Sequence, residues 1–227
     1  MPENFSFRMT DEEYRVLEKI KNSIPVCYLA DHADFALGIV TGNNKKFLSA
    51  EKTENSEMVL KGTDICKYHI NPVKQYLRFE PEQFQQVAPL EIYRAPEKLL
   101  YRFISNQLVV AYDDRQMLSL NSCNIVIPKI EGMQIKYILA ILNSSVSQFV
   151  YQKEFHSIKV LRAHMEHIPI PRVGKAIQNE IIAMTEPLIC GMGKEAAETC
   201  QKRLDCRIMD LFRFSAEEQW IIRHALH

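Results

Sequence analysis

Two adjacent carboxylates and two closely spaced histidines are the side chains whose types best suit catalysis or metal binding. A metal-dependent nuclease needs clustered acids and a nearby lysine, and Asp113 and Asp114 form an acid pair in the middle of the chain. The same pair also suits a turn between two strands. His164 and His167 are three residues apart, so they could share one helix face as metal ligands. No third ligand follows at a suitable spacing, so we expect capping or solvated histidines and no metal site.

Three other regions combine cations with hydrogen-bonding side chains, which suits nucleic-acid binding. They are residues 41–46, residues 61–69, and the loops 113–122 joined by residues 153–162. Each lies where a strand or helix should end, so we expect them to converge on one DNA-facing surface. The candidate DNA-binding residues are Thr41, Asn43, Asn44, Lys45, Lys46, Lys61, Lys67, Tyr68, His69, Arg102, Arg115, Asn121, Ser122, Lys153, His156, Lys159 and Arg162.

Within this set, residue type separates two roles. Lysines hold phosphates and position a protein on DNA without specifying a sequence, which we assign to Lys45, Lys46, Lys61, Lys67 and Lys153. Arginine pairs bidentately with guanine and asparagine with adenine, so base edges are assigned to Arg115, Asn121 and Arg162.

A strand-rich core around residues 96–128 must position these side chains. Its apolar runs, residues 98–104, 108–112 and 123–127, are separated by polar turn clusters and predict consecutive antiparallel strands. Pro96 and Pro128 bracket the unit, because proline donates no ladder hydrogen bond. Residues 133–149 carry a continuous apolar stripe at helical spacing, and we expect this helix to cover the sheet. Its polar residues 143–145 should lie where the stripe turns outward.

The flanking regions are predicted to form helices, a short strand, an irregular region and an extended segment. Thr10 and Glu13 form a capping box that predicts a helix over residues 11–23, and Ser215 and Glu218 form a second one before a terminal helix. Residues 26–29 predict a short strand and residues 168–171 an extended strap. We expect residues 71–89 to be irregular, and residues 176–206 to form helical segments interrupted near Pro187 and residues 191–193. A separate segment, residues 206–212, should follow.

The predicted fold class is therefore α+β. We expect an N-terminal helix and linker (residues 1–25), a strand-rich DNA-binding domain with a packed helix (26–175) and a helical tail (176–227).

Composition narrows the class of protein further. The 227 residues carry 28 basic and 28 acidic side chains, so a simple polycation that binds nucleic acid nonspecifically is disfavoured. Residues 91–175 nevertheless hold 11 Lys and Arg against 7 Asp and Glu. The 6 scattered cysteines form no CxxC pair, which favours a reducing cytoplasm over a disulfide framework. No apolar run approaches the roughly 20 residues of a membrane helix, and the start of the chain lacks the pattern of a signal peptide.

Six segments together resemble one family. Residues 38–47 (GIVTGNNKKF) are similar to its GI-x-TG-x-N-x-x-F opening, and residues 60–68 (LKGTDICKY) to its L-[RK]-G-x-D-I-x-[RK]-Y segment. Tyr101 and Arg102, followed by residues 110–122, resemble its strand, acidic turn and return. Residues 137–144 (YILAILNS), 161–171 and 211–218 are similar to its helix, its proline strap and its tail. The family is the C-terminal target-recognition (specificity) domain of TaqI-like and type IIG restriction–modification enzymes, whose methyltransferases modify adenine at N6.

The resemblance implies a non-catalytic module that recognises a sequence in double-stranded DNA, with a methyltransferase or endonuclease domain or subunit as its partner. It also replaces the simpler interpretation of residues 42–44 as a hairpin turn. The cofactor turn (FxGxG) and adenine clamp (NPPY) of complete enzymes are missing from this sequence. S-adenosylmethionine is therefore expected only on a separate or missing catalytic domain. Two alternatives remain open, namely a protein-interaction or specificity subunit without direct DNA contact, and a nuclease.

Overall fold

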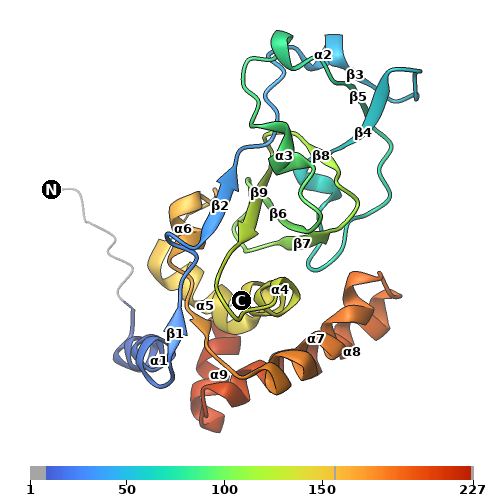
Figure 1. Cartoon of the computed structure of the whole chain (residues 1–227). Helices are drawn as coiled ribbons and strands as arrows, with labels where there is room; N and C mark the ends of the chain where they lie inside the picture. The colour runs from blue at the N-terminus through green and yellow to red at the C-terminus, as the bar shows by residue number, and fades with distance from the viewer. Residues whose placement is uncertain (1–8, 156, 226–227) are drawn as a thin grey trace, which may run out of the picture.

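A four-stranded antiparallel sheet with the order β2-β9-β6-β7 forms the centre of the protein (Figure 1). The computed structural model describes residues 9–155 and 157–225. The strands are β2 (Ala33–Ala36), β6 (Lys98–Arg102), β7 (Val110–Asp113) and β9 (Cys123–Pro128). The three strands predicted within residues 96–128 are confirmed. They are not paired in chain order, because β6 lies between β7 and β9.

This sheet has two buried faces. Successive side chains of a strand point to opposite faces, and in β6 they join different clusters, Leu99 and Tyr101 one core and Leu100 the other. The first core includes α1, α4, α5 and the C-terminal helices, and the second includes the strands of a smaller sheet. Burial on both faces explains why the sequences of these strands are nearly continuous runs of apolar residues.

The smaller sheet has the order β3-β5-β4-β8 and caps the second core. Its strands are β3 (Leu48–Ser49), β4 (Ser56–Leu60), β5 (Tyr76–Arg78) and β8 (Leu118–Ser119), with the short helices α2 (Asn44–Phe47), η1 (Gly62–Asp64), η2 (Pro81–Gln83) and α3 (Leu90–Tyr93) between strands. The prediction that residues 71–89 are irregular is wrong at β5. That strand is held by neighbours on both sides, Leu48 in β3 and Glu57 in β4 both pairing with Leu77.

The N-terminal helix α1 (Asp11–Asn22) begins at the predicted capping box. Thr10 Oγ1 accepts a hydrogen bond from Glu13 N at 3.2 Å, and Glu13 Oε2 accepts one from Thr10 N at 3.0 Å. β1 (Val26–Cys27) follows and pairs with β10 (Ile170–Pro171), which confirms the short strand and the extended strap. The first and last thirds of the chain are thereby joined.

The helix expected over residues 133–149 is two helices, α4 (Ile135–Asn143) and α5 (Ser145–Phe155). The break falls at Ser144, whose backbone is extended and whose Oγ accepts from Ser147 N. The polar residues there do not face outward, because Asn143 and Ser144 are buried. Asn143 bonds both the N–H and the carbonyl of Val110. These side chains end one helix, begin the next and complete the edge of β7.

The C-terminal region consists of α6 (Arg162–Glu166), α7 (Lys175–Ile189), α8 (Lys194–Leu211) and α9 (Ala216–His224). α7 and α8 are the long helices below the sheet in Figure 1, and α7 packs on α4. The predicted break near Pro187 is wrong, because α7 includes Pro187 and ends at Ile189. The predicted segment of residues 206–212 is the end of α8. The second capping box is confirmed at Ser215.

The fold class predicted from the sequence, α+β with a packed helix and a helical C-terminal region, is confirmed. Among the residues that the structure describes, no helix has both the length and the apolar character needed to cross a membrane.

Candidate nucleic-acid interface

Three chain segments run parallel to one another and leave the sheets at the same edge. β4 and β8 pair in parallel, with Leu60 opposite Ser119, and Ile39 forms a parallel bridge with Leu120. Segments that run parallel have their carboxyl ends at the same edge. The residues that follow Ile39, Leu60 and Leu120 therefore emerge side by side.

The side chains at this edge line a polar hollow of about 430 Å³. Its polar lining comes from three predicted regions and one residue that we did not predict: Asn44, Lys45, Lys61, Asn121, Ser122 and, newly, Gln75. We call this feature the edge hollow. Its lysines and asparagines are exposed, so cations and amide groups face solvent together.

Two glycines allow the three segments to lie this close. A Cβ at Gly38 would be 2.1 Å from the carbonyl oxygen of Leu120, and one at Gly62 would be 2.5 Å from that of Ser122. Gly62 N also donates to Ser122 Oγ at 2.9 Å. Any side chain at either position would separate the segments that carry the lining.

Local hydrogen bonds hold the first segment in place. Thr41 is buried, and its Oγ1 donates to Asn44 Oδ1 at 2.6 Å. Asn43 caps the one-turn helix α2 by accepting from Lys46 N at 3.2 Å. Lys46 donates to Gln83 Oε1 at 2.6 Å and so lies beside the hollow and not in its lining. Of the two lysines, Lys45 is the one presented to the hollow.

A second cationic segment adjoins the edge hollow. Phe103 N donates to Ser122 O at 3.0 Å, and Val160 N donates to Phe103 O at 2.8 Å. These bonds place residues 159–162 about two strand spacings, roughly 10 Å, from the hollow. Lys159 and Arg162 are exposed there, and Arg162 Nε forms an ion pair with Glu166 at 2.7 Å.

Arg102 lies behind this surface and positions it. Its Nε donates to Gly62 O at 2.9 Å, and a second guanidinium nitrogen donates to Ile65 O. The guanidinium thus fixes the loop after β4. Arg102 is a predicted DNA-binding residue, and two of its guanidinium nitrogens are already bonded to backbone carbonyls.

Other predicted residues lie elsewhere, which corrects the expectation of one common surface. Lys67 lines a different cavity, beside α8. Tyr68 is buried along β7, its N–H donating to Val110 O at 2.7 Å. His69 lies next to Gly191, at the turn between α7 and α8.

Arg115 and Lys153 are also separate from the edge hollow. Arg115 precedes β8, whereas the hollow follows it, and its neighbour Gln116 is bonded by Arg94, the partner of Glu57 at the opposite end of β4. Lys153 pairs with Glu13 at 2.6 Å, and both side chains are mostly buried. His156 lies outside the described residues.

Asp113, the first acid of the Asp113–Asp114 pair, has a structural role. Its carboxylate is buried and accepts hydrogen bonds from Lys98 Nζ at 2.5 Å, Met117 N at 2.9 Å and Arg115 N at 3.0 Å. Lys98 is itself fully buried, and its pKa is lowered by burial, an effect that Asp113 partly offsets. A carboxylate with these partners is engaged within the fold, so Asp113 gives the nuclease interpretation no support.

His164 and His167 have local partners. His164 Nδ1 accepts from Leu161 N at 3.2 Å, its ring stacks on Phe155 at 4.5 Å, and burial lowers its pKa. His167 Nδ1 lies 2.6 Å from Ala163 O. Across residues 9–155 and 157–225, no group of three or more His, Cys, Asp or Glu side chains could hold a metal ion.

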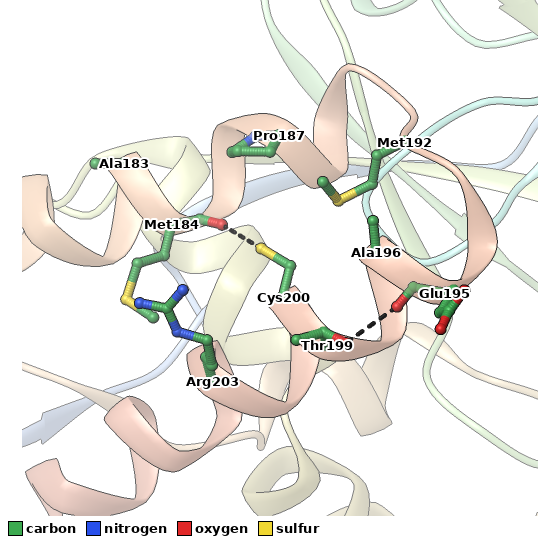
Figure 2. Close-up of a pocket in the computed structure, with 9 residues that line it drawn as sticks. All are labelled: Ala183, Met184, Pro187, Met192, Glu195, Ala196, Thr199, Cys200 and Arg203. Atoms are coloured by element: carbon green, nitrogen blue, oxygen red, sulfur yellow. Dashed lines mark hydrogen bonds between the residues drawn. The ribbon is translucent and has the colours of Figure 1, made fainter.

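An apolar hollow of about 630 Å³ lies between α7 and α8 (Figure 2). Met184, Pro187 and Met192 supply much of its wall. Its smaller polar groups are bonded within or between the helices: Cys200 Sγ donates to Met184 O at 3.4 Å and Thr199 Oγ1 to Glu195 O at 3.1 Å. The two charged residues of its lining, Glu195 and Arg203, are exposed, and we assign this hollow no chemistry.

The structure thus combines two sheets and a helical C-terminal region with a polar hollow where the parallel segments end. The model of the TaqI-like C-terminal specificity domain matches residues 57–170, half of the chain. The protein belongs to this family of restriction–modification specificity domains.

Solved structures share the fold at low identity. The type IIL restriction–modification enzyme MmeI, solved in complex with DNA, is similar with a TM-score of 0.59 and 10% identity over 88% of this chain and 36% of its own. The type IIG restriction endonuclease BpuSI is similar with a TM-score of 0.55 and 12% identity over 96% of this chain and 32% of its own. The chain thus corresponds to about a third of each enzyme. A comparison with curated proteins found no match.

Proposed function

We propose that this chain recognises a specific sequence in double-stranded DNA for a restriction–modification enzyme and has no catalytic activity of its own. The observation that carries the proposal is the convergence of Lys45, Lys61 and Asn121 on one exposed hollow, from three segments far apart in the sequence. Family membership supports the same role.

The lining divides into two kinds of contact. Lys45 and Lys61 hold backbone phosphates, which sets the position of the protein on the duplex. Asn44 and Asn121 present amides that can both donate and accept, the pattern that matches adenine in the major groove. Lys159 and Arg162, on the adjoining segment, extend the footprint along the phosphates.

Catalysis belongs to a partner domain or subunit. The chain carries neither the FxGxG nor the NPPY pattern of an adenine methyltransferase. S-adenosylmethionine and the transfer of its methyl group are therefore assigned to a methyltransferase or endonuclease partner. The cytoplasm, where such a partner meets chromosomal DNA, is the proposed location.

Selection of duplexes from a random pool, followed by fluorescence anisotropy on the selected site, tests this function. Lys61→Ala should weaken binding to every duplex and reduce the salt slope by about 0.9, because one phosphate contact is lost. Asn121→Ala should cost about 1–3 kcal/mol on the selected site only.

Arg213→Ala is the control, because Arg213 is exposed in the turn between α8 and α9. Equal losses for Arg213→Ala and Lys61→Ala would place the interface elsewhere. A chain that selects no sequence and passes through heparin at low salt would be a protein-interaction module instead.

A further inference from the structure

A second polar cavity lies where the C-terminal helices meet the central sheet, separate from the edge hollow. It measures about 600 Å³. Lys67 enters it from the loop after η1, Ser145 from the start of α5, Lys202 and Asp205 from α8, and Arg223 from α9. Four parts of the fold therefore contribute to one site, which we call the tail cavity.

Among the described residues, the cations of the tail cavity have no carboxylate within ion-pair distance. Lys67 Nζ makes one long hydrogen bond, to Asn143 O at 3.3 Å. Arg223 donates to neutral groups, among them Gln219 Oε1 at 3.2 Å. In the part of the chain that the structure describes, no ion pair within 4.0 Å involves Lys67, Lys202 or Arg223.

The one carboxylate of this lining is already engaged. Asp205 accepts hydrogen bonds from Ser145 N at 2.7 Å and from Ser145 Oγ, and so caps α5. Burial lowers the pKa of Lys67, and Asp205 offsets only part of that effect. Three cations against one carboxylate leave an excess of positive charge in a partly buried space.

The backbone fixes Lys67 at this site. Tyr68, the next residue, has a φ of 75°, which is unfavourable for a bulky side chain. Two hydrogen bonds to β7 hold it there: Tyr68 N donates to Val110 O at 2.7 Å, and Tyr68 O accepts from Tyr112 N at 3.2 Å. Strained residues of this kind persist only where the surrounding structure enforces them. The lysine is thereby held against the cavity wall.

We propose that the tail cavity binds a phosphate-bearing anion, which links Lys67 on the core to Lys202 and Arg223 on the C-terminal helices. Ammonium and guanidinium groups form strong charge-assisted hydrogen bonds with phosphate oxygens. The phosphate comes either from the DNA backbone or from a free phosphorylated small molecule. In both cases the ligand stabilises the attachment of α8 and α9 to the sheet.

Thermal unfolding of the full chain with pyrophosphate as the probe tests this site, with sodium chloride at matched ionic strength as the reference. Because the ligand binds the folded state, Tm should rise by about 3–5 °C for each tenfold increase in pyrophosphate above its Kd. Lys202→Gln should reduce this rise by at least half, and Lys67→Met combined with Arg223→Gln should abolish it.

Lys194→Gln is the matched control, because Lys194 is an exposed lysine on α8 that does not line the cavity. It should leave the pyrophosphate response unchanged. Lys202 is also exposed, so Lys202→Gln keeps the test decisive if the double variant fails to fold. No rise beyond the chloride reference, or equal responses of Lys194→Gln and Lys202→Gln, would overturn the proposal.

Competition with a DNA duplex distinguishes the two sources. If pyrophosphate displaces DNA and Lys202→Gln lowers DNA affinity, the phosphate belongs to the DNA backbone. If pyrophosphate binds with DNA affinity unchanged in both measurements, the ligand is a free phosphorylated small molecule. Either outcome supports the site, and neither depends on the edge hollow.

Discussion

Asp113 belongs to the acid pair that the sequence offered for metal-dependent catalysis, and in the structure it pairs with Lys98. Both side chains are fully buried, and their atoms are 2.5 Å apart. Lys98 also donates to Tyr93 O at 2.6 Å, so the network links β6, β7 and the end of α3. Removing one partner of such a pair leaves an uncompensated buried charge, which is strongly destabilising.

We predict that Lys98→Met lowers the free energy of unfolding by about 3–5 kcal/mol in urea denaturation. Lys129→Met is the matched control, because Lys129 and its partner Asp34 are exposed. Exposed pairs contribute about 0–1 kcal/mol. A similar loss for both variants would mean that Asp113 is rehydrated or protonated at little cost.

Gly62 offers a residue-scale test of the edge hollow. Its missing Cβ makes room for the carbonyl of Ser122, 2.5 Å from where that Cβ would lie. Gly62→Ala should push residues 121–122 away and cost about 1–3 kcal/mol of stability, as overpacking does. DNA affinity should fall for every sequence. Gly174→Ala is the control, because nothing lies within 4 Å of its added Cβ. Unchanged DNA binding by Gly62→Ala would separate this contact from recognition.

At the scale of elements, α4 is the helix that the sequence identifies most directly. Its apolar stripe predicts burial against the sheet, and Leu139 is fully buried in the first core. Leu139→Ala should destabilise the protein by about 2–5 kcal/mol. Leu90→Ala is the same substitution at an exposed position, with 46% of the residue accessible, and should cost less than about 1 kcal/mol. A loss this small at Leu139, measured by urea denaturation, would place α4 outside the core.

Elements that depend on local chemistry could be predicted, and those that depend on distant partners could not. Both capping boxes lie within four residues of sequence, so the starts of α1 and α9 follow from local hydrogen bonds. The break at Ser144 depends on Val110, 33 residues before Asn143. β8 has two residues and exists because β4 lies beside it. No periodicity within residues 118–119 could have revealed that pairing.

At the scale of the whole molecule, the candidate interface also depends partly on local residue types and partly on contacts between distant segments. Residue types indicated Lys45, Lys61 and Asn121, and the parallel chain ends bring them together. Lys67 has the same residue type and lies six positions after Lys61, yet the turn at Tyr68 directs the chain to the tail cavity. Sequence spacing does not predict that turn, because hydrogen bonds to β7 hold Tyr68 at a φ of 75°.

We expect the whole chain to recognise DNA without transferring a methyl group. It matches the specificity domain and spans 36% of MmeI and 32% of BpuSI, and the 227 residues contain no FxGxG or NPPY pattern. The glycine turn and the adenine clamp supply the contacts that hold the cofactor and the target base. We therefore predict that isothermal titration with S-adenosylmethionine detects no binding, and that the chain transfers no labelled methyl group to its selected duplex. The same preparation should bind that duplex by anisotropy, which excludes misfolding as the reason for a negative titration. Stoichiometric binding of S-adenosylmethionine would instead reveal a cofactor site that these two patterns do not describe.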